Sequence, residues 1–238
     1  MLSVLLSNLF ACCLMLQAAD GGTIIVAAAS DLAPIEQQMK DLAPKLPLRF
    51  VFGSSGQLAS QIRGGAPYDV YLSANLDFVR ALETEGRLVV GSVRQYARGR
   101  LALYSRDGKV TTLEQLAGVR NIAIANPAHA PYGVAAKQVL PAGLGKKIVY
   151  AENVRQALQF AESGNAEAAI VAWALVKGRP GAVLLPESLH APIIQGLAVV
   201  RGKAKDAEHT GRAIAFVDAL TSKAGQAMLR EAGFAVGK

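Results

Sequence analysis

Four junctions between a predicted strand and a predicted helix carry groups that could donate hydrogen bonds to a bound anion. They contain Ser30, Ser55, Tyr132 and Val154, in chain order. In open α/β sheets, ligands bind beyond the carboxyl ends of the strands, where the following helix presents unpaired N–H groups. Hydroxyl and amide donors that meet there, without a nucleophile and a base beside them, predict binding of an anion rather than catalysis.

The first two junctions are built from small residues and serines. The apolar run 23–28 leads through alanines to Ser30, and the run 48–52 leads into Gly53-Ser54-Ser55-Gly56-Gln57. Small side chains let a ligand approach the backbone, and a Gly/Ser turn before a helix is typical of an anion nest. Each serine could instead be an ordinary helix N-cap. Asp31 would repel an anion if its carboxylate faced the same space.

The other two junctions offer backbone amides at helix starts. After the apolar run 121–125, Pro131 suits the first turn of a helix and leaves Tyr132 with a free N–H and a phenol. Asn153 precedes a helical pattern and has the residue type of an N-cap. The Val154 N–H would then be free for a ligand.

The strands that must position these groups alternate with helical patterns. We expect them at residues 23–28, 48–52, 70–73, 121–125, 147–151 and 168–172. Short apolar runs of this kind predict parallel sheets in a doubly wound α/β arrangement.

Two further apolar runs, 101–104 and 193–200, bracket the middle of the chain. They predict two lobes joined by a two-strand hinge, with a cleft between the lobes. The first lobe comprises residues 20–100 and 197–238, and the second lobe comprises residues 101–196.

The amino-terminal segment predicts export. Residues 1–19 carry no charge and contain an apolar stretch that ends in small residues, so we interpret them as a signal peptide. Cys12 makes a lipid anchor the alternative. Both cysteines lie in this leader, so the exported chain would contain neither disulfides nor thiol chemistry.

Composition excludes several other classes. The chain has 238 residues, of which 52% are hydrophobic and 18% charged, as expected for a folded α/β protein rather than a disordered one. The three histidines are scattered, so no metal site is predicted. The net charge of +7 suits an anionic partner. The lysines and arginines are dispersed and not interleaved with aromatics, which argues against nucleic acid.

From about Thr23 to its end the chain resembles the periplasmic molybdate-binding proteins of ABC importers. The most specific stretches are AAASDL, FGSSGQLASQIRGGAPYDVYLSAN, NPAHAPYGVAAKQVL and ENVRQALQFAESGNAEAAIV. The resemblance implies a type II periplasmic-binding-protein fold and ligand contacts from Ser30, Ser55, Tyr132 and Val154.

The chain departs from the family pattern at two places. A fifth family contact commonly comes from a tyrosine where this chain has Ala172, followed by Trp173. The resemblance therefore predicts that the Trp173 N–H, a water molecule or Tyr132 replaces that donor. Gly56 stands where relatives often have a third serine.

The resemblance also implies the biological role. We expect a monomeric periplasmic binding protein, not an enzyme, that carries molybdate, and tungstate as well, to an ABC permease in the inner membrane. No cofactor is expected. The alternatives are a binding protein for sulfate or phosphate, and an enzyme on the same two-lobed fold.

Overall fold

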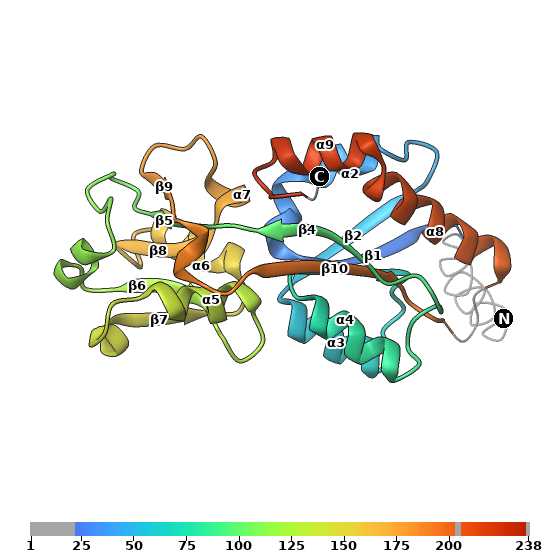
Figure 1. The fold of residues 1–238 in the computed structure, drawn as a ribbon, viewed down its shortest axis with the longest axis horizontal. Helices are drawn as coiled ribbons and strands as arrows, with labels where there is room; N and C mark the ends of the chain where they lie inside the picture. Colours follow the sequence, from blue (N-terminus) through green and yellow to red (C-terminus); the bar gives the residue numbers. More distant parts are fainter. Residues whose placement is uncertain (1–21, 203–205, 237–238) are drawn as a thin grey trace, which may run out of the picture.

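Two five-stranded mixed sheets form the centres of two lobes in this computed structural model, which describes residues 22–202 and 206–236. The strand order is β2-β1-β3-β10-β4 in the first sheet and β7-β6-β8-β5-β9 in the second. Figure 1 shows the lobes side by side along the long axis of the molecule. The predicted leader, including Cys12, lies outside the described residues.

Most of the strands form at short apolar runs, and the central ones are buried along their whole length. They are β1 (Ile24–Ala29), β2 (Leu48–Gly53), β3 (Val70–Ser73), β4 (Arg94–Gly99), β5 (Leu101–Tyr104), β6 (Ile122–Ala125), β7 (Ile148–Ala151), β8 (Ala168–Ala172), β9 (Ala182–Leu184) and β10 (Ile193–Val199). The apolar runs predicted eight of these ten strands to within a residue or so at either end. Sequence reasoning missed β4, whose run RQYARG is interrupted by arginines, and β9, which has only three residues.

Helices cover both faces of the first sheet. They are the 3-10 helix η1 (Ser30–Ile35), α2 (Glu36–Asp41), α3 (Ser55–Arg63), α4 (Leu76–Thr84), α8 (Ala207–Thr221) and α9 (Lys223–Glu231). Leu32, Met39 and Phe216 belong to the apolar core on one face, whereas Leu58 and Leu82 belong to the core on the other. In Figure 1, α8 and α9 accordingly lie on one side of this sheet, and α3 and α4 lie on the opposite side.

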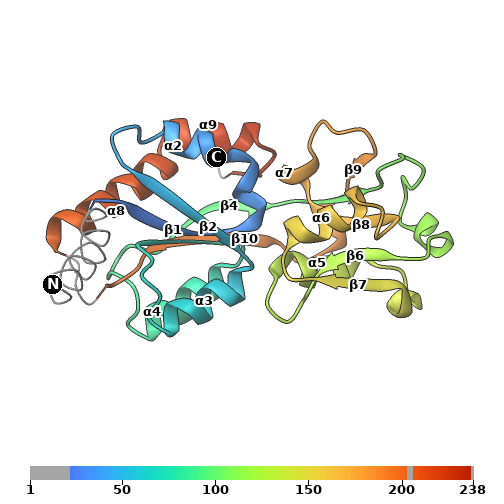
Figure 2. The same ribbon diagram turned by 180° about the vertical axis from the view of Figure 1, so that it is seen from behind.

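The second lobe has a single continuous core around its sheet. Its helices are η2 (Glu114–Gly118), α5 (Pro131–Val139), η3 (Leu144–Lys147), α6 (Val154–Glu162), α7 (Trp173–Val176) and η4 (Glu187–Leu189). Strand β6 reads IAIA and β8 reads AAIVA, and every residue of both is buried, as expected for strands covered on two faces. Figure 2 shows this lobe from behind.

Two chain segments connect the lobes, as the sequence predicts. Strand β4 ends in the first sheet at Gly99, and β5 begins in the second sheet at Leu101, so Arg100 alone separates them. The chain returns ahead of β10, which pairs antiparallel with β3 and β4 from Ile193 onward. The predicted boundary between residues 196 and 197 falls inside this strand.

No helix in residues 22–202 and 206–236 is long and apolar enough to cross a membrane.

Candidate functional site

The carboxyl ends of four parallel strands, two from each lobe, surround a small interlobe cavity. Strands β1 and β2 are neighbours in the first sheet, and β6 and β7 are neighbours in the second. The cavity is lined by Ala29, Ser30, Asp31, Gly53, Ser54, Ser55, Ala74, Ala130, Pro131, Tyr132 and Val154. Its volume of about 10 Å³ is close to the lower limit for one water molecule. The lobes are therefore closed on each other, and a ligand must enter while they are apart.

The serine hydroxyls of the first lobe are not used as helix caps. Ser30 is the first residue of η1 rather than its N-cap, and its hydroxyl makes no hydrogen bond within the described chain. Ser55 Oγ accepts a hydrogen bond of 2.9 Å from the Ala74 N–H, which leaves the Ser55 proton free to be donated. Both residues are at most 3% exposed. The two hydroxyls can thus act as donors toward the cavity.

The second lobe contributes backbone donors at two helix starts. Pro131 is the first residue of α5, so the Tyr132 N–H belongs to the opening turn and has no partner within the helix. Asn153 caps α6 by accepting a 3.0 Å hydrogen bond from the Gln156 N–H, as expected for an N-cap. The Val154 N–H is left unpaired at the cavity wall. The positive ends of both helix dipoles favour an anion here.

Ala172 and Trp173 do not line this cavity. Ala172 is fully buried at the end of β8, where it pairs with Leu101. The Trp173 backbone N–H donates to the Arg100 carbonyl at 2.8 Å, and the Trp173 ring lies against Gly233 at the end of the first lobe. The contact between Trp173 and Gly233 passes between the lobes, whereas the pair of Ala172 and Leu101 lies within the second sheet.

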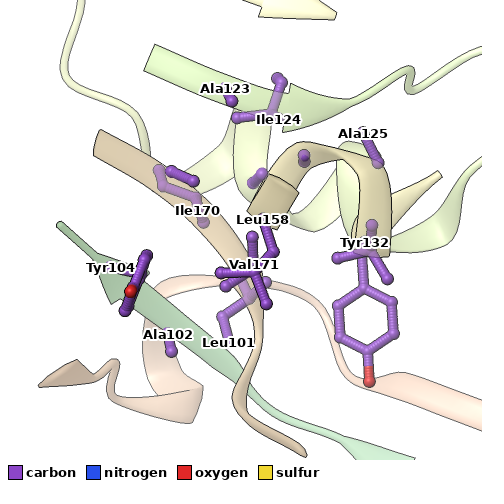
Figure 3. Packing of buried hydrophobic residues seen from close by; sticks show 14 of the residues in the cluster. Leu101, Ala102, Tyr104, Ala123, Ile124, Ala125, Tyr132, Leu158, Ile170 and Val171 are labelled. Atoms are coloured by element: carbon purple, nitrogen blue, oxygen red, sulfur yellow. The ribbon is translucent and has the colours of Figure 1, made fainter. Parts of the chain in front are cut away.

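A buried polar cluster of Asp31, Tyr132 and Gln195 joins the lobes behind the cavity. The Tyr132 hydroxyl donates to Asp31 Oδ2 at 2.9 Å, and Gln195 Nε2 donates to the same oxygen at 2.6 Å. Figure 3 shows the Tyr132 phenol extending away from the apolar cluster of its own lobe, with its oxygen at the outer end. Gly99 makes this possible, because a Cβ there would lie 2.3 Å from the phenol oxygen.

Burial dominates the electrostatics of this cluster. Desolvation raises the pKa of Asp31 to about 6, although the hydrogen bonds from Gln195 and Tyr132, and the backbone N–H groups of Asp31 and Leu32, act in the opposite direction. Burial and the nearby Asp31 charge raise the pKa of Tyr132 well above its usual value, so its hydroxyl stays protonated. No lysine or arginine is among the cavity-lining residues of the described chain.

A second set of contacts crosses the cleft at the start of α3. The Gly56 N–H donates to the His129 carbonyl at 2.9 Å, and Ser54 Oγ lies 2.8 Å from His129 Nδ1. Gln57 Nε2 donates to Glu152 Oε2 at 2.6 Å. These bonds form only when the lobes are closed, so they contribute to the free energy of closure.

A larger open groove of about 340 Å³ adjoins the cavity along the same cleft. Its polar lining includes Asn75, Asp77, Arg80, Gln95 and Gln138. The smaller cavity is the candidate for the predicted anion site, because buried hydroxyls and helix-start amides converge on it, whereas the groove offers charges of both signs. The described residues also contain no cluster of His, Cys, Asp or Glu suited to a metal ion.

Removing the cap of α6 should weaken anion binding as well as the fold. Asn153→Ala should lower the free energy of unfolding by about 1 kcal/mol, because the Gln156 N–H loses its acceptor. The first turn of α6 would fray, and the Val154 N–H would be less well placed for a ligand. Asn75 caps α4 in the same way, outside the cavity, and so provides a matched control. Chemical denaturation should show similar losses for Asn75→Ala and Asn153→Ala, and only Asn153→Ala should lose affinity. Equal affinities would mean that this helix start does not contact the ligand.

Comparison with known proteins identifies the family. The family model described as bacterial extracellular solute-binding protein matches residues 24–235. The chain belongs to this family. It is 33% identical over 237 residues to the molybdate-binding protein ModA of Rhodobacter capsulatus, covering 93% of this chain and 91% of that protein. It is 37% identical over 211 residues to ModA of Azotobacter vinelandii, with 79% and 81% covered.

A solved member of the family has the same fold. The structure of the periplasmic molybdate-binding protein of Azotobacter vinelandii superposes with a TM-score of 0.81 at 30% identity, and covers 90% of this chain and 100% of that one. The two-lobed α/β architecture predicted from the sequence is confirmed. Family membership also places the chain among solute-binding proteins that act outside the cytoplasm.

Sequence reasoning missed several residues that the fold brings to the site. Gln195 and Ala74 lie outside the predicted junctions, whereas His129 and Ala130 directly precede Pro131 and reach the site at the start of α5. Asp31 was not missed, because the sequence marks it as a carboxylate beside Ser30, and the structure places it in the cavity wall.

Proposed function

We propose that this chain captures molybdate, and tungstate as well, in the interlobe cavity and delivers it to an ABC permease in the inner membrane. The named relatives, two molybdate-binding proteins at 33% and 37% identity, support the choice of ligand. The proposed contacts are the Ser30 and Ser55 hydroxyls and the N–H groups of Tyr132 and Val154. Ala172 and Trp173 are left out, because both are occupied elsewhere.

The observation that carries this proposal is a cavity wall that presents neutral hydroxyl and amide donors and, apart from Asp31, no ionisable carboxyl group among the lining residues that the structure describes. A fully ionised oxyanion offers only acceptors, and each hydrogen bond to a charged group contributes about 1.5–3 kcal/mol. Helix N-termini supply the positive potential that a lysine or arginine would otherwise provide. Tungstate has nearly the size and charge of molybdate, so such donors would not separate the two.

We further propose that ligand binding stabilises the closed form and that the closed form, as a monomer, docks on the permease. The interlobe bonds of Gly56, Gln57 and Tyr132 are the contacts that would be gained. A catalytic role is not proposed, since the matching family model is one of solute-binding proteins. Residues 1–19 are the proposed export signal, with lipid attachment at Cys12 as its alternative.

Calorimetry and thermal shift with molybdate, tungstate, sulfate and phosphate test this function. Molybdate and tungstate should bind with similar affinity and raise the melting temperature, because each binds only the folded state. Sulfate is smaller and should bind more weakly, since it cannot reach all the donors at once. Phosphate keeps a proton near neutral pH and would need an acceptor in the wall, which Asp31 could supply only in its ionised form. Equal binding of sulfate or phosphate would refute the specificity, and no response to any oxyanion would refute the function.

A further inference from the structure

Asp31 is a fully buried carboxyl group in the wall of the proposed oxyanion cavity. Its side chain is 0% exposed, and its Oδ2 atom accepts hydrogen bonds from Tyr132 and Gln195. Its Oδ1 atom is also buried and has no hydrogen-bond partner within the described chain. Burying an oxygen without a hydrogen-bond partner costs free energy. An unscreened negative charge beside a bound anion costs still more free energy.

No nearby cation offsets this carboxylate. The ionisable groups that act on it are the phenols of Tyr132 on α5 and Tyr96 on β4, both of which are buried. Strand β1, helix α7 and strand β10 carry no charged residue. The charged residues of the remaining elements around Asp31 are all exposed or half-exposed: Glu36, Lys40 and Asp41 on α2, Arg49 on β2, Arg94 and Arg98 on β4, Lys137 on α5, and Arg155 and Glu162 on α6.

We propose that Asp31 contacts the bound oxyanion in its protonated form, so that capture of a dianion takes up one proton from the solvent. The inference rests on the proposed function, because it requires the oxyanion to occupy the cavity that Asp31 lines. Protonated Oδ1 becomes a donor, and the oxyanion becomes its missing acceptor. Oδ2 meanwhile keeps its bonds from Tyr132 and Gln195.

The direction in which molybdate affinity changes with pH follows from the pKa of Asp31 before and after the anion binds. Burial in the closed cavity without an anion raises the pKa of Asp31 to about 6, so the carboxyl is mostly ionised there at pH 7.5. A dianion beside it raises its pKa further, because the charged form is then repelled. Binding therefore takes up a proton above about pH 6 and no longer does so below that pH. Tyr132 does not titrate in this range.

Calorimetry on the intact wild-type protein measures the proton directly. Sodium molybdate is titrated at pH 7.5 in buffers of different ionisation enthalpy, and the dissociation constant is measured from pH 6.5 to pH 8.5, where molybdate stays a dianion. We expect uptake of about one proton per bound anion, and affinity that falls about tenfold per pH unit.

Two variants test whether the proton taken up on binding goes to Asp31. Asp31→Asn keeps an oxygen for Tyr132 and Gln195 and places an N–H₂ donor where protonated Oδ1 would be. It should bind molybdate without proton uptake, and its affinity should not change with pH. Asp41→Asn removes the same charge from the exposed end of α2 and should behave as wild type.

The outcomes separate this inference from the proposed function. Tight molybdate binding by the wild type with no proton uptake and no pH dependence would overturn the role of Asp31 and leave the function standing. Selective phosphate binding without proton uptake would overturn it too, because Asp31 would then act as an ionised acceptor. Unchanged proton uptake in Asp31→Asn would assign the proton to another group. If no oxyanion bound at any pH, the proposed function itself would be refuted.

Discussion

Replacing Gly56 by alanine should weaken molybdate binding by about fivefold to 150-fold, the range that corresponds to the usual cost of overpacking of about 1–3 kcal/mol. A Cβ at this position would lie 2.8 Å from the His129 carbonyl oxygen and 3.0 Å from both the His129 Cα and Cβ atoms. The first two of these atoms are backbone, so no side-chain rotation relieves the contact. The lobes would have to stop short of the observed closure, and the 2.9 Å bond from the Gly56 N–H to His129 would lengthen.

The free protein should stay folded, because alanine is the better helix former by about 1 kcal/mol and Gly56 lies inside the first turn of α3. Gly64→Ala is the matched control. It changes the same residue type at the end of the same helix, where a Cβ would meet its nearest neighbour at an ordinary 3.4 Å. Calorimetry and melting curves of both variants provide the test. If Gly56→Ala bound as tightly as Gly64→Ala, the closed contact at His129 would not contribute to ligand binding.

The contact at His129 also predicts the effect of introducing the family's serine at residue 56. The family resemblance implies a serine at the position of Gly56, and a serine Cβ would meet the same His129 atoms. In this chain the glycine lets the start of α3 and the loop at His129 approach within hydrogen-bond distance. Gly56→Ser should therefore weaken binding as Gly56→Ala does.

Ser55→Ala should weaken molybdate binding by about 10-fold to 150-fold, because one hydrogen bond of about 1.5–3 kcal/mol to the charged ligand is lost. The same change should lower stability. Ser55 Oγ accepts from the buried Ala74 N–H, and leaving that donor without a partner costs about 1–3 kcal/mol. A lower melting temperature is thus expected together with the lower affinity, and the two effects need to be separated.

Ser105→Ala is the control that separates the loss of affinity from the loss of stability. Ser105 is a fully buried serine of the second lobe whose Oγ accepts from the Val110 N–H at 3.1 Å, and it does not line the cavity. It should lose comparable stability and keep its affinity for molybdate. Calorimetry well below both melting temperatures compares the two variants. Similar affinity in Ser55→Ala and Ser105→Ala would show that the Ser55 hydroxyl does not contact the anion.

The amino-acid sequence by itself determined the lobes and the positions of the donors along the chain. Runs such as Ile24–Ala29 and Ile122–Ala125 are apolar, short and followed by helix-start residues, and these signals are local. Asn153 is an N-cap because its side-chain oxygen accepts a hydrogen bond from the Gln156 N–H. Pro131 begins α5 because its ring suits the first turn of a helix. The convergence of four strand ends follows from the topology of parallel sheets.

Only the tertiary structure decided how the lobes meet. The bond between Tyr132 and Asp31 spans 101 residues of sequence, and that between Gln195 and Asp31 spans 164. No periodicity or cap encodes such contacts, because they depend on the angle that the hinge sets between two separately folded sheets. The same holds for Trp173, which lies against Gly233 of the other lobe. The sequence therefore predicted which groups could bind an anion, and the closure of the lobes placed a buried carboxyl group among them, because burial is a property of the packed molecule.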